Sequence, residues 1–315
     1  MATRKEFLKT AGLVGLAGMV SPAKVIAQSA PKSSPAAGQH WADGSRLVVS
    51  VSMQFEAGGQ PEDNPESPFP RNMPKGYKDL PATTWYQYGY KEGIPRMLDN
   101  WDKHGIKVTS HMVGSAVEKH PALAKEIVQR GHEAAAHGRD WASQYMLPYE
   151  EEKRFIMDGI EAVRKATGVT PIGYNANWMR RGDNTLTILQ ELGFLYHIDD
   201  LSRDEPFITK VNNLDFVVVP YTLRCNDIQL VAGQWFSSDQ FLQQVKMEFD
   251  QLYEESAHRR RMMSISFHDR IGGTPQLVKA TSELLAYMQQ HPGVVFKRKD
   301  DIAKMALADK STIRE

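Results

Sequence analysis

The chain lacks features that would assign it to several common classes of protein. It has one cysteine, Cys225, in 315 residues, so no disulfide can form within it, and a buried thiol is a better interpretation than a nucleophile. Its 38 basic residues balance its 38 acidic residues, whereas a general binder of nucleic acid or anionic membranes needs a basic excess. We interpret the cluster at 258–261 (His-Arg-Arg-Arg) as a solvated helix end and expect no nucleic-acid partner.

Two short motifs are also absent. The chain contains no Gly-x-x-x-x-Gly-Lys phosphate loop and no Gly-x-Ser-x-Gly sequence. The first absence argues against a P-loop nucleotide hydrolase, and the second leaves a hydrolase with an elbow serine without support.

Residues 1–27 predict an export signal. Arg4-Lys5 precede an uncharged stretch at 10–20, and small residues end at Ala27. Residues 3–9 resemble the twin-arginine export consensus with Lys in place of the second Arg. The apolar run is too short for a transmembrane helix, so we expect no stable membrane insertion after cleavage. Residues 28–45 predict a flexible linker, and the expected location is the bacterial periplasm or the medium.

Residues 46–308 predict one catalytic domain, followed by a tail at 309–315. Strand-like runs alternate with helical runs along it. The predicted strands are 47–53, 106–113, 133–136, 172–174, 194–198, 216–220, 263–267 and 294–296, and the predicted helices are 92–104, 121–130, 150–167, 184–192, 238–257, 275–290 and one from 299. This alternation predicts an α/β fold, a distorted (β/α) barrel with seven or eight mostly parallel strands. Irregular segments at 55–90 and 199–237 account for the distortion.

Polar residues follow the predicted strands, and in a parallel barrel these strand ends meet at one mouth. Glu56, His137 and His268 are the candidate catalytic residues, because a carboxylate with two histidines suits hydrolysis by activated water. Glu56 could instead be a solvated loop carboxylate. Four other residues near the predicted strands favour a structural role over a catalytic one. We interpret His111 and His132 as structural, and Asp199 and Asp200 as turn residues.

Several segments together resemble the polysaccharide deacetylase superfamily (carbohydrate esterase family four). The resemblance runs from about 48 to 303 and is closest to the amide-hydrolysing branch, which includes peptidoglycan-deacetylase-like proteins and deacetylase-type allantoinases. The segments that carry it, in order, are 52–59, 88–98, 131–138, 171–174, 193–199 and 268–275.

The resemblance bears on metal binding. Metal-dependent members of the superfamily bind zinc or a similar cation with an Asp and two His four residues apart, and the matching positions here are Glu56, His137 and Trp141. Members of the superfamily commonly have an aspartate two residues before the first ligand, and Gln54 occupies that position here. A Glu with His-x-x-x-Trp resembles the allantoinase-like branch, which works without a bound metal. We therefore expect no cofactor; a zinc or other divalent cation, if bound, would use Glu56 and His137.

The residues and the resemblance together predict an exported hydrolase of non-peptide C–N bonds in a small amide, imide or ureide. Glu56 would be the general base on water, His137 would orient that water or polarise the carbonyl, and His268 would protonate the leaving nitrogen or stabilise the oxyanion. The predicted substrate contacts are Trp141, Trp85, Tyr86, Asn175, Trp178 and Arg270. The two aromatic residues at 85 and 86 could instead cover a barrel end.

Two other functions stay open at this point. One is metal-dependent N-deacetylation of a glycan or peptidoglycan, and the other is a catalytically inactive barrel that binds a glycan or a small solute. The oligomeric state also stays open, with a homo-oligomer as one alternative, since the sequence shows no interface.

Overall fold

The computed structural model describes residues 41–62, 65–69, 71, 73–74 and 76–315. The predicted export signal and most of the predicted linker therefore lie outside the described residues. None of the helices in the described part is long and apolar enough to cross a membrane.

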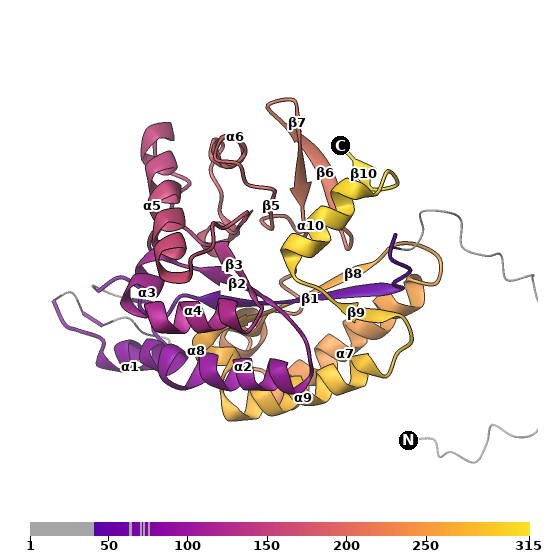
Figure 1. The fold of residues 1–315 in the computed structure, drawn as a ribbon. Helices are drawn as coiled ribbons and strands as arrows, with labels where there is room; N and C mark the ends of the chain where they lie inside the picture. The colour runs from indigo at the N-terminus through magenta and orange to yellow at the C-terminus, as the bar shows by residue number, and fades with distance from the viewer. Residues whose placement is uncertain (1–40, 63–64, 70, 72, 75) are drawn as a thin grey trace, which may run out of the picture. The chain divides into compact units, whose positions relative to one another are not determined.

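Ten strands form one sheet (Figure 1). They are β1 (Leu47–Phe55), β2 (Thr109–Met112), β3 (Glu133–Ala136), β4 (Gly173–Tyr174), β5 (Tyr196–His197), β6 (Phe207–Val211), β7 (Leu214–Val218), β8 (Met262–His268), β9 (Val294–Phe296) and β10 (Ile313–Arg314). The order is β10-β6-β7-β5-β4-β3-β2-β1-β8, with β9 also on β1, and only the β6–β7 pair is antiparallel. The predicted α/β fold with a mostly parallel sheet is confirmed; among the described residues, hydrogen bonds do not close the barrel.

Strands β1 and β8 are buried on both faces, but the two faces differ in chemistry. Alternate residues of β1 from Leu47 to Phe55 join the main apolar core, as do Met263, Ile265 and Phe267 of β8. The residues between them form polar rows on the other face: Ser50, Ser52 and Gln54 on β1, and Ser264, Ser266 and His268 on β8. Because side chains alternate along a strand, each strand places a polar row on the interior face and ends it in a functional group.

The helices are α1 (Leu80–Tyr88), α2 (Ile94–Lys103), α3 (Gly114–Lys119), α4 (Pro121–Gln129), α5 (Tyr149–Thr167), α6 (Thr185–Glu191), α7 (Ser238–Glu255), α8 (Asp269–Gly272), α9 (Pro275–Gln289) and α10 (Lys299–Ala308). Helices α2, α7 and α9 pack beneath β1 and β8 in Figure 1. Local signals set several boundaries: a capping box at Ser237 starts α7, and Gly168, at φ +79°, ends α5.

Helix α10 plugs the amino-terminal end of the sheet interior. The buried ammonium of Lys299 donates hydrogen bonds to the hydroxyls of Ser50 and Ser264 at 3.2 and 3.3 Å. Burial lowers the pKa of Lys299 to about 8, with the charge of Glu133 opposing that shift. The plug leaves the carboxyl ends of the strands as the accessible side of the interior.

The structure differs from the sequence prediction in three segments. Strand β6, in the segment expected to be irregular, forms a hairpin with β7 through Asn212 and Asn213, whose φ angles of +51° and +63° suit a tight turn. Helix α1 lies within the segment 55–90, which was expected to be irregular. The predicted tail contains β10, which pairs with β6, so it is part of the sheet.

The basic cluster at 258–261 is also different from the expected solvated helix end. Arg260 is buried and donates hydrogen bonds to the side chains of Asp309, Ser311 and Thr312, which holds the C-terminal segment. The carbonyl of Arg261 accepts a hydrogen bond from the indole of Trp41, the first described residue. Trp41 is buried, although it falls in the predicted linker.

Replacing Arg260 by Ala should lower the free energy of unfolding by about 2 kcal/mol, because the side chains of Asp309, Ser311 and the buried Thr312 lose their donor. Arg259→Ala is the matched control: the Arg259 side chain is 58% exposed and pairs only with Glu255 among the described residues, so its loss should cost under about 0.5 kcal/mol. Urea unfolding of the two variants measures the difference, and equal effects would contradict the anchoring role of Arg260.

Candidate active site

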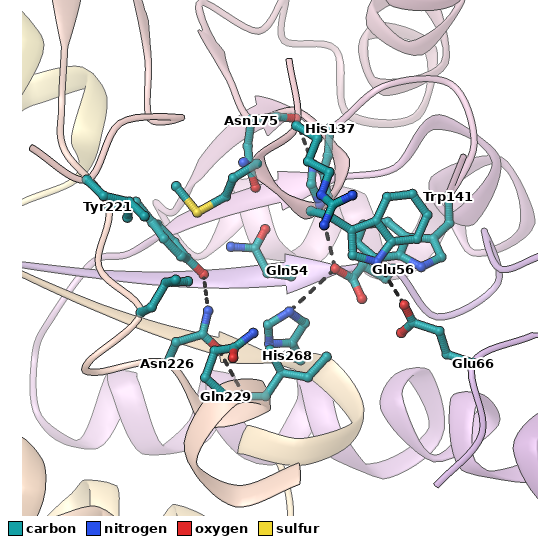
Figure 2. Close-up of a pocket in the computed structure, with 16 residues that line it drawn as sticks. Gln54, Glu56, Glu66, His137, Trp141, Asn175, Tyr221, Asn226, Gln229 and His268 are labelled. Carbon is teal, nitrogen blue, oxygen red and sulfur yellow. Dashed lines mark hydrogen bonds and ion pairs between the residues drawn. The ribbon is translucent and has the colours of Figure 1, made fainter. Parts of the chain in front are cut away.

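A cavity of about 530 Å³ lies at the carboxyl ends of the strands (Figure 2). Its floor brings together Gln54 and Glu56 from the end of β1, His137 after β3, and His268 at the end of β8. The register of the sheet explains why the ends of β1 and β8 share this floor, since Gln54 pairs directly with His268. The three residues predicted to be catalytic therefore share one cavity.

The carboxylate of Glu56 is fully buried, and its two oxygens have different surroundings. Oε2 accepts a hydrogen bond from the guanidinium of Arg270 at 2.6 Å. Oε1 has no hydrogen-bond partner among the described residues and lies 3.6 Å from Nε2 of His137 and 3.6 Å from Nε2 of His268. One oxygen is thus held by the protein and the other faces two imidazoles.

Electrostatics keep this carboxylate ionised. Burial alone would raise the pKa of Glu56, but the positive charges of His268 and Arg270 outweigh burial and bring the pKa far below its usual value. Glu56 is therefore negatively charged across the ordinary pH range. The loop interpretation of Glu56 as a solvated carboxylate does not describe its environment.

His268 is held by Asp227. Nδ1 of His268 lies 2.7 Å from Oδ1 of Asp227, and the backbone N–H of His268 donates to Oδ2 at 2.8 Å. Burial lowers the pKa of His268, but the carboxylates of Glu56 and Asp227 reverse that effect and raise it overall. His268 therefore favours the protonated state, with Nε2–H directed at the cavity.

His137 is oriented by a backbone carbonyl. Its Nδ1 lies 2.7 Å from the carbonyl oxygen of Asn175, which can only accept, so Nδ1 carries the proton and Nε2 faces Glu56. Asn175 is itself fixed, because its amide nitrogen donates to Asp199 at 2.6 Å. Burial raises the pKa of Asp199 to about 6, although hydrogen bonds from Ala176 and Asn175 oppose the rise. Asp199 is therefore buried behind the site, not placed in an exposed turn.

Aromatic side chains form one wall of the cavity. The rings of His137 and Trp141 are 5.4 Å apart, and those of Trp141 and Trp178 are 4.4 Å apart. Trp178 adopts φ +54°, a conformation that is strained for a non-glycine residue, and its indole donates to Glu66 at 2.8 Å. Trp141, Asn175 and Trp178 all line the cavity, as predicted for substrate contacts.

Three other predicted substrate contacts lie elsewhere. The guanidinium of Arg270 is buried, binds Glu56, and lies 4.7 and 4.3 Å from the ring centres of Trp85 and Tyr86. Tyr86 is fully buried, and Trp85 lines a separate hollow on the far side of Arg270. Trp85 and Tyr86 contact Arg270, which binds Glu56, and none of the three lines the cavity that contains Glu56.

Four residues that line or support the cavity were not predicted from the sequence: Asn226, Asp227, Gln229 and Glu66. Three of them belong to the irregular segment at 199–237, and Glu66 belongs to the long loop after β1. An isolated parallel bridge between Asn226 and Ser266 continues the sheet beside β8, which places Asp227 next to His268. A one-residue bridge leaves no periodic pattern in the sequence. The one available signal was the acidic residue Asp227 itself, a possible partner for a histidine.

The donor set does not fit a catalytic zinc. The position that matches the second histidine is Trp141, whose indole nitrogen donates and cannot bind a cation. Arg270 takes up one oxygen of Glu56. No cluster of three or more His, Cys, Asp or Glu with metal-binding geometry occurs in the described part of the chain, whereas catalytic zinc normally has three protein ligands.

The chain is similar to known proteins in both sequence and structure. The polysaccharide deacetylase model matches residues 80–197. The crystal structure of the Puue allantoinase superposes with a TM-score of 0.80 at 28% identity, covering 86% of this chain and 93% of that one. Residues 80–197 thus match a polysaccharide deacetylase domain, and the whole fold is similar to that of solved polysaccharide deacetylase and allantoinase structures.

Two further proteins are similar to this chain. A Pseudomonas aeruginosa protein described as a "probable polysaccharide deacetylase" superposes with a TM-score of 0.80 at 28% identity, over 86% of this chain and 94% of its own. A peptidoglycan deacetylase of Helicobacter pylori is 22% identical over 67% of this chain and 82% of its own length. These similarities identify the protein as a hydrolase of carbon–nitrogen bonds other than peptide bonds, as the sequence predicted.

Replacing Asp227 by Asn should lower kcat/KM about a hundredfold and move the alkaline limb of its pH profile to lower pH. The Asp227 carboxylate raises the pKa of His268, so its loss lets His268 deprotonate at a lower pH. Steady-state pH profiles and NMR titration of His268 measure both effects. Asp239→Asn, on the exposed first turn of α7, is the control and should change neither. An unshifted limb would remove Asp227 from the protonation of His268.

Proposed function

We propose that the protein hydrolyses a C–N bond in a small amide, imide or ureide without a bound metal, with Glu56 as the general base. One observation carries this proposal: the unpaired Oε1 of a buried, ionised Glu56 lies 3.6 Å from Nε2 of both His137 and His268. These separations are too long for direct hydrogen bonds and leave a position where a water or a reacting carbonyl can contact all three groups.

The proposed reaction balances with these residues alone. Glu56 takes one proton from water, and the resulting hydroxide adds to the carbonyl carbon. Nε2 of His137 orients the water, or polarises the carbonyl when it is protonated. His268 gives its Nε2 proton to the departing nitrogen, and the C–N bond breaks to leave a carboxylic acid and an amine, or an amide when the substrate is an imide. Transfer of the proton from Glu56 to Nε2 of His268 then restores both residues.

Charge coupling makes the low pKa of Glu56 compatible with its role as a base. Positive charge on His268 contributes to the lowering. When His268 transfers its proton to the leaving nitrogen, that charge disappears from the site. The proton affinity of Glu56 then rises while it holds the proton of the attacking water, so the two transfers favour each other.

The dimensions and walls of the cavity suit a compact substrate. Its volume of about 530 Å³ falls in the range of small-molecule sites. The faces of Trp141 and Trp178 on one side suit a planar amide or ring. The similarity to an allantoinase supports a ureide-like substrate, and the similarity to a peptidoglycan deacetylase supports the acetamide of a glycan as the second candidate.

Glu56→Gln should lower turnover at least a hundredfold and leave the fold intact, because the amide keeps the size of the carboxylate and cannot take a proton. A screen of amides, imides and ureides, with circular dichroism as the folding check, measures both. Glu62→Gln, on the exposed loop after β1, is the control and should keep wild-type activity. Near-normal activity of Glu56→Gln would remove Glu56 from the mechanism.

The same screen separates the candidates by their metal dependence. The proposed reaction predicts equal activity before and after chelation and no stoichiometric metal by elemental analysis. Activity lost on chelation and restored by zinc, with N-acetyl glycans as substrates, would establish the metal-dependent deacetylase instead. Binding without turnover of any compound would indicate the inactive barrel.

We also propose that the protein is exported, on the composition of residues 1–27 alone. Expression of the full chain should place the protein in the periplasmic fraction with a new N-terminus near residue 28. Replacing Arg4 and Lys5 by Ala should retain it in the cytoplasm if the twin-arginine-like motif is read. Unchanged fractionation of this variant would argue against that route.

A further inference from the structure

The side chain of Gln54 has one satisfied end and one free end. Gln54 is 2% exposed, and its amide nitrogen donates to the hydroxyl of Ser266 at 3.1 Å. Its oxygen Oε1 is buried and has no hydrogen-bond partner among the described residues. Leaving a buried acceptor unpaired costs about 1–3 kcal/mol, so this oxygen needs a donor in the working enzyme.

The free oxygen lies beside the catalytic groups. Gln54 and Glu56 are two residues apart at the end of β1, so both side chains project to the interior face. Gln54 also pairs in register with His268 on the adjacent strand. Figure 2 shows the oxygen of Gln54 turned away from Tyr221, toward the part of the cavity where Glu56 and His137 lie.

We propose that Gln54 is a specificity-determining residue that accepts a hydrogen bond from the N–H of the scissile amide or imide. This inference rests on the proposed function and narrows its substrate class to compounds whose reacting nitrogen carries a hydrogen. Nitrogens that are fully substituted by carbon are excluded.

The chemistry of the departing nitrogen supports this assignment. When water adds to the carbonyl, the nitrogen regains a lone pair that must accept the proton of His268. An N–H held by Oε1 of Gln54 fixes the rotation of that nitrogen, and its lone pair can then face Nε2 of His268 on the neighbouring strand. An N-methyl group would leave Oε1 unpaired and would place an apolar group against it.

Succinimide and N-methylsuccinimide test the inference, because they differ only at the reacting nitrogen. The wild-type enzyme should prefer succinimide at least tenfold in kcat/KM. In Gln54→Met, which keeps the side-chain length and removes the acceptor, the ratio should fall to within about twofold of unity. The control is Gln251→Met on the exposed face of α7, which should keep the wild-type ratio.

A second measurement separates this inference from the proposed reaction. Quenching of tryptophan fluorescence, with Trp141 and Trp178 in the cavity wall, gives the dissociation constants of both compounds. Selective binding without hydrolysis would overturn the proposed reaction and retain the role of Gln54. Hydrolysis of both imides at equal rates would support the proposed reaction and overturn the role of Gln54. A preference that persists unchanged in Gln54→Met, or no binding of either imide, would overturn the inference.

Discussion

The buried charge of Glu56 is the constraint on which the site depends. An ionised carboxylate in a protein interior costs several kcal/mol unless opposite charges and hydrogen bonds compensate it. Two residues provide much of this compensation, since His268 faces Oε1 and Arg270 binds Oε2. Between them in the chain, Asp269 fixes the backbone by accepting hydrogen bonds from the N–H groups of Glu56 and Ala57. The end of β8 therefore fixes both the backbone and the side chain at the end of β1.

This arrangement bears on the proposed hydrolysis without a metal. Positive charge near Glu56 comes from Arg270 and His268, and the Asp227 carboxylate helps keep His268 protonated. Trp141 stands where a second histidine ligand would be and packs against Trp178. A cationic imidazole can donate a proton to a leaving nitrogen, whereas a metal supplies charge without a proton.

The alternation of the two central strands prepares the site. Apolar residues on one face of β1 and β8 pack against the helices, and serines make the other face polar. Lys299 occupies its amino-terminal end through Ser50 and Ser264. The interior rows end in Gln54 and His268, so two residues of the cavity floor follow from the same period of two that forms the core.

Local sequence patterns were enough to predict the parallel α/β architecture, most of the helices, and the strand-end positions of Glu56, His137 and His268. These features depend on short-range periodicity and on motifs in a recognisable order. The Asp227–His268 pair joins residues 41 apart in the chain, and the Arg270–Glu56 pair joins residues 214 apart. The β6–β7 hairpin and β10 were missed too. Only tertiary packing decides such pairs, because side-chain partners across strands depend on register and approach, which no local pattern encodes.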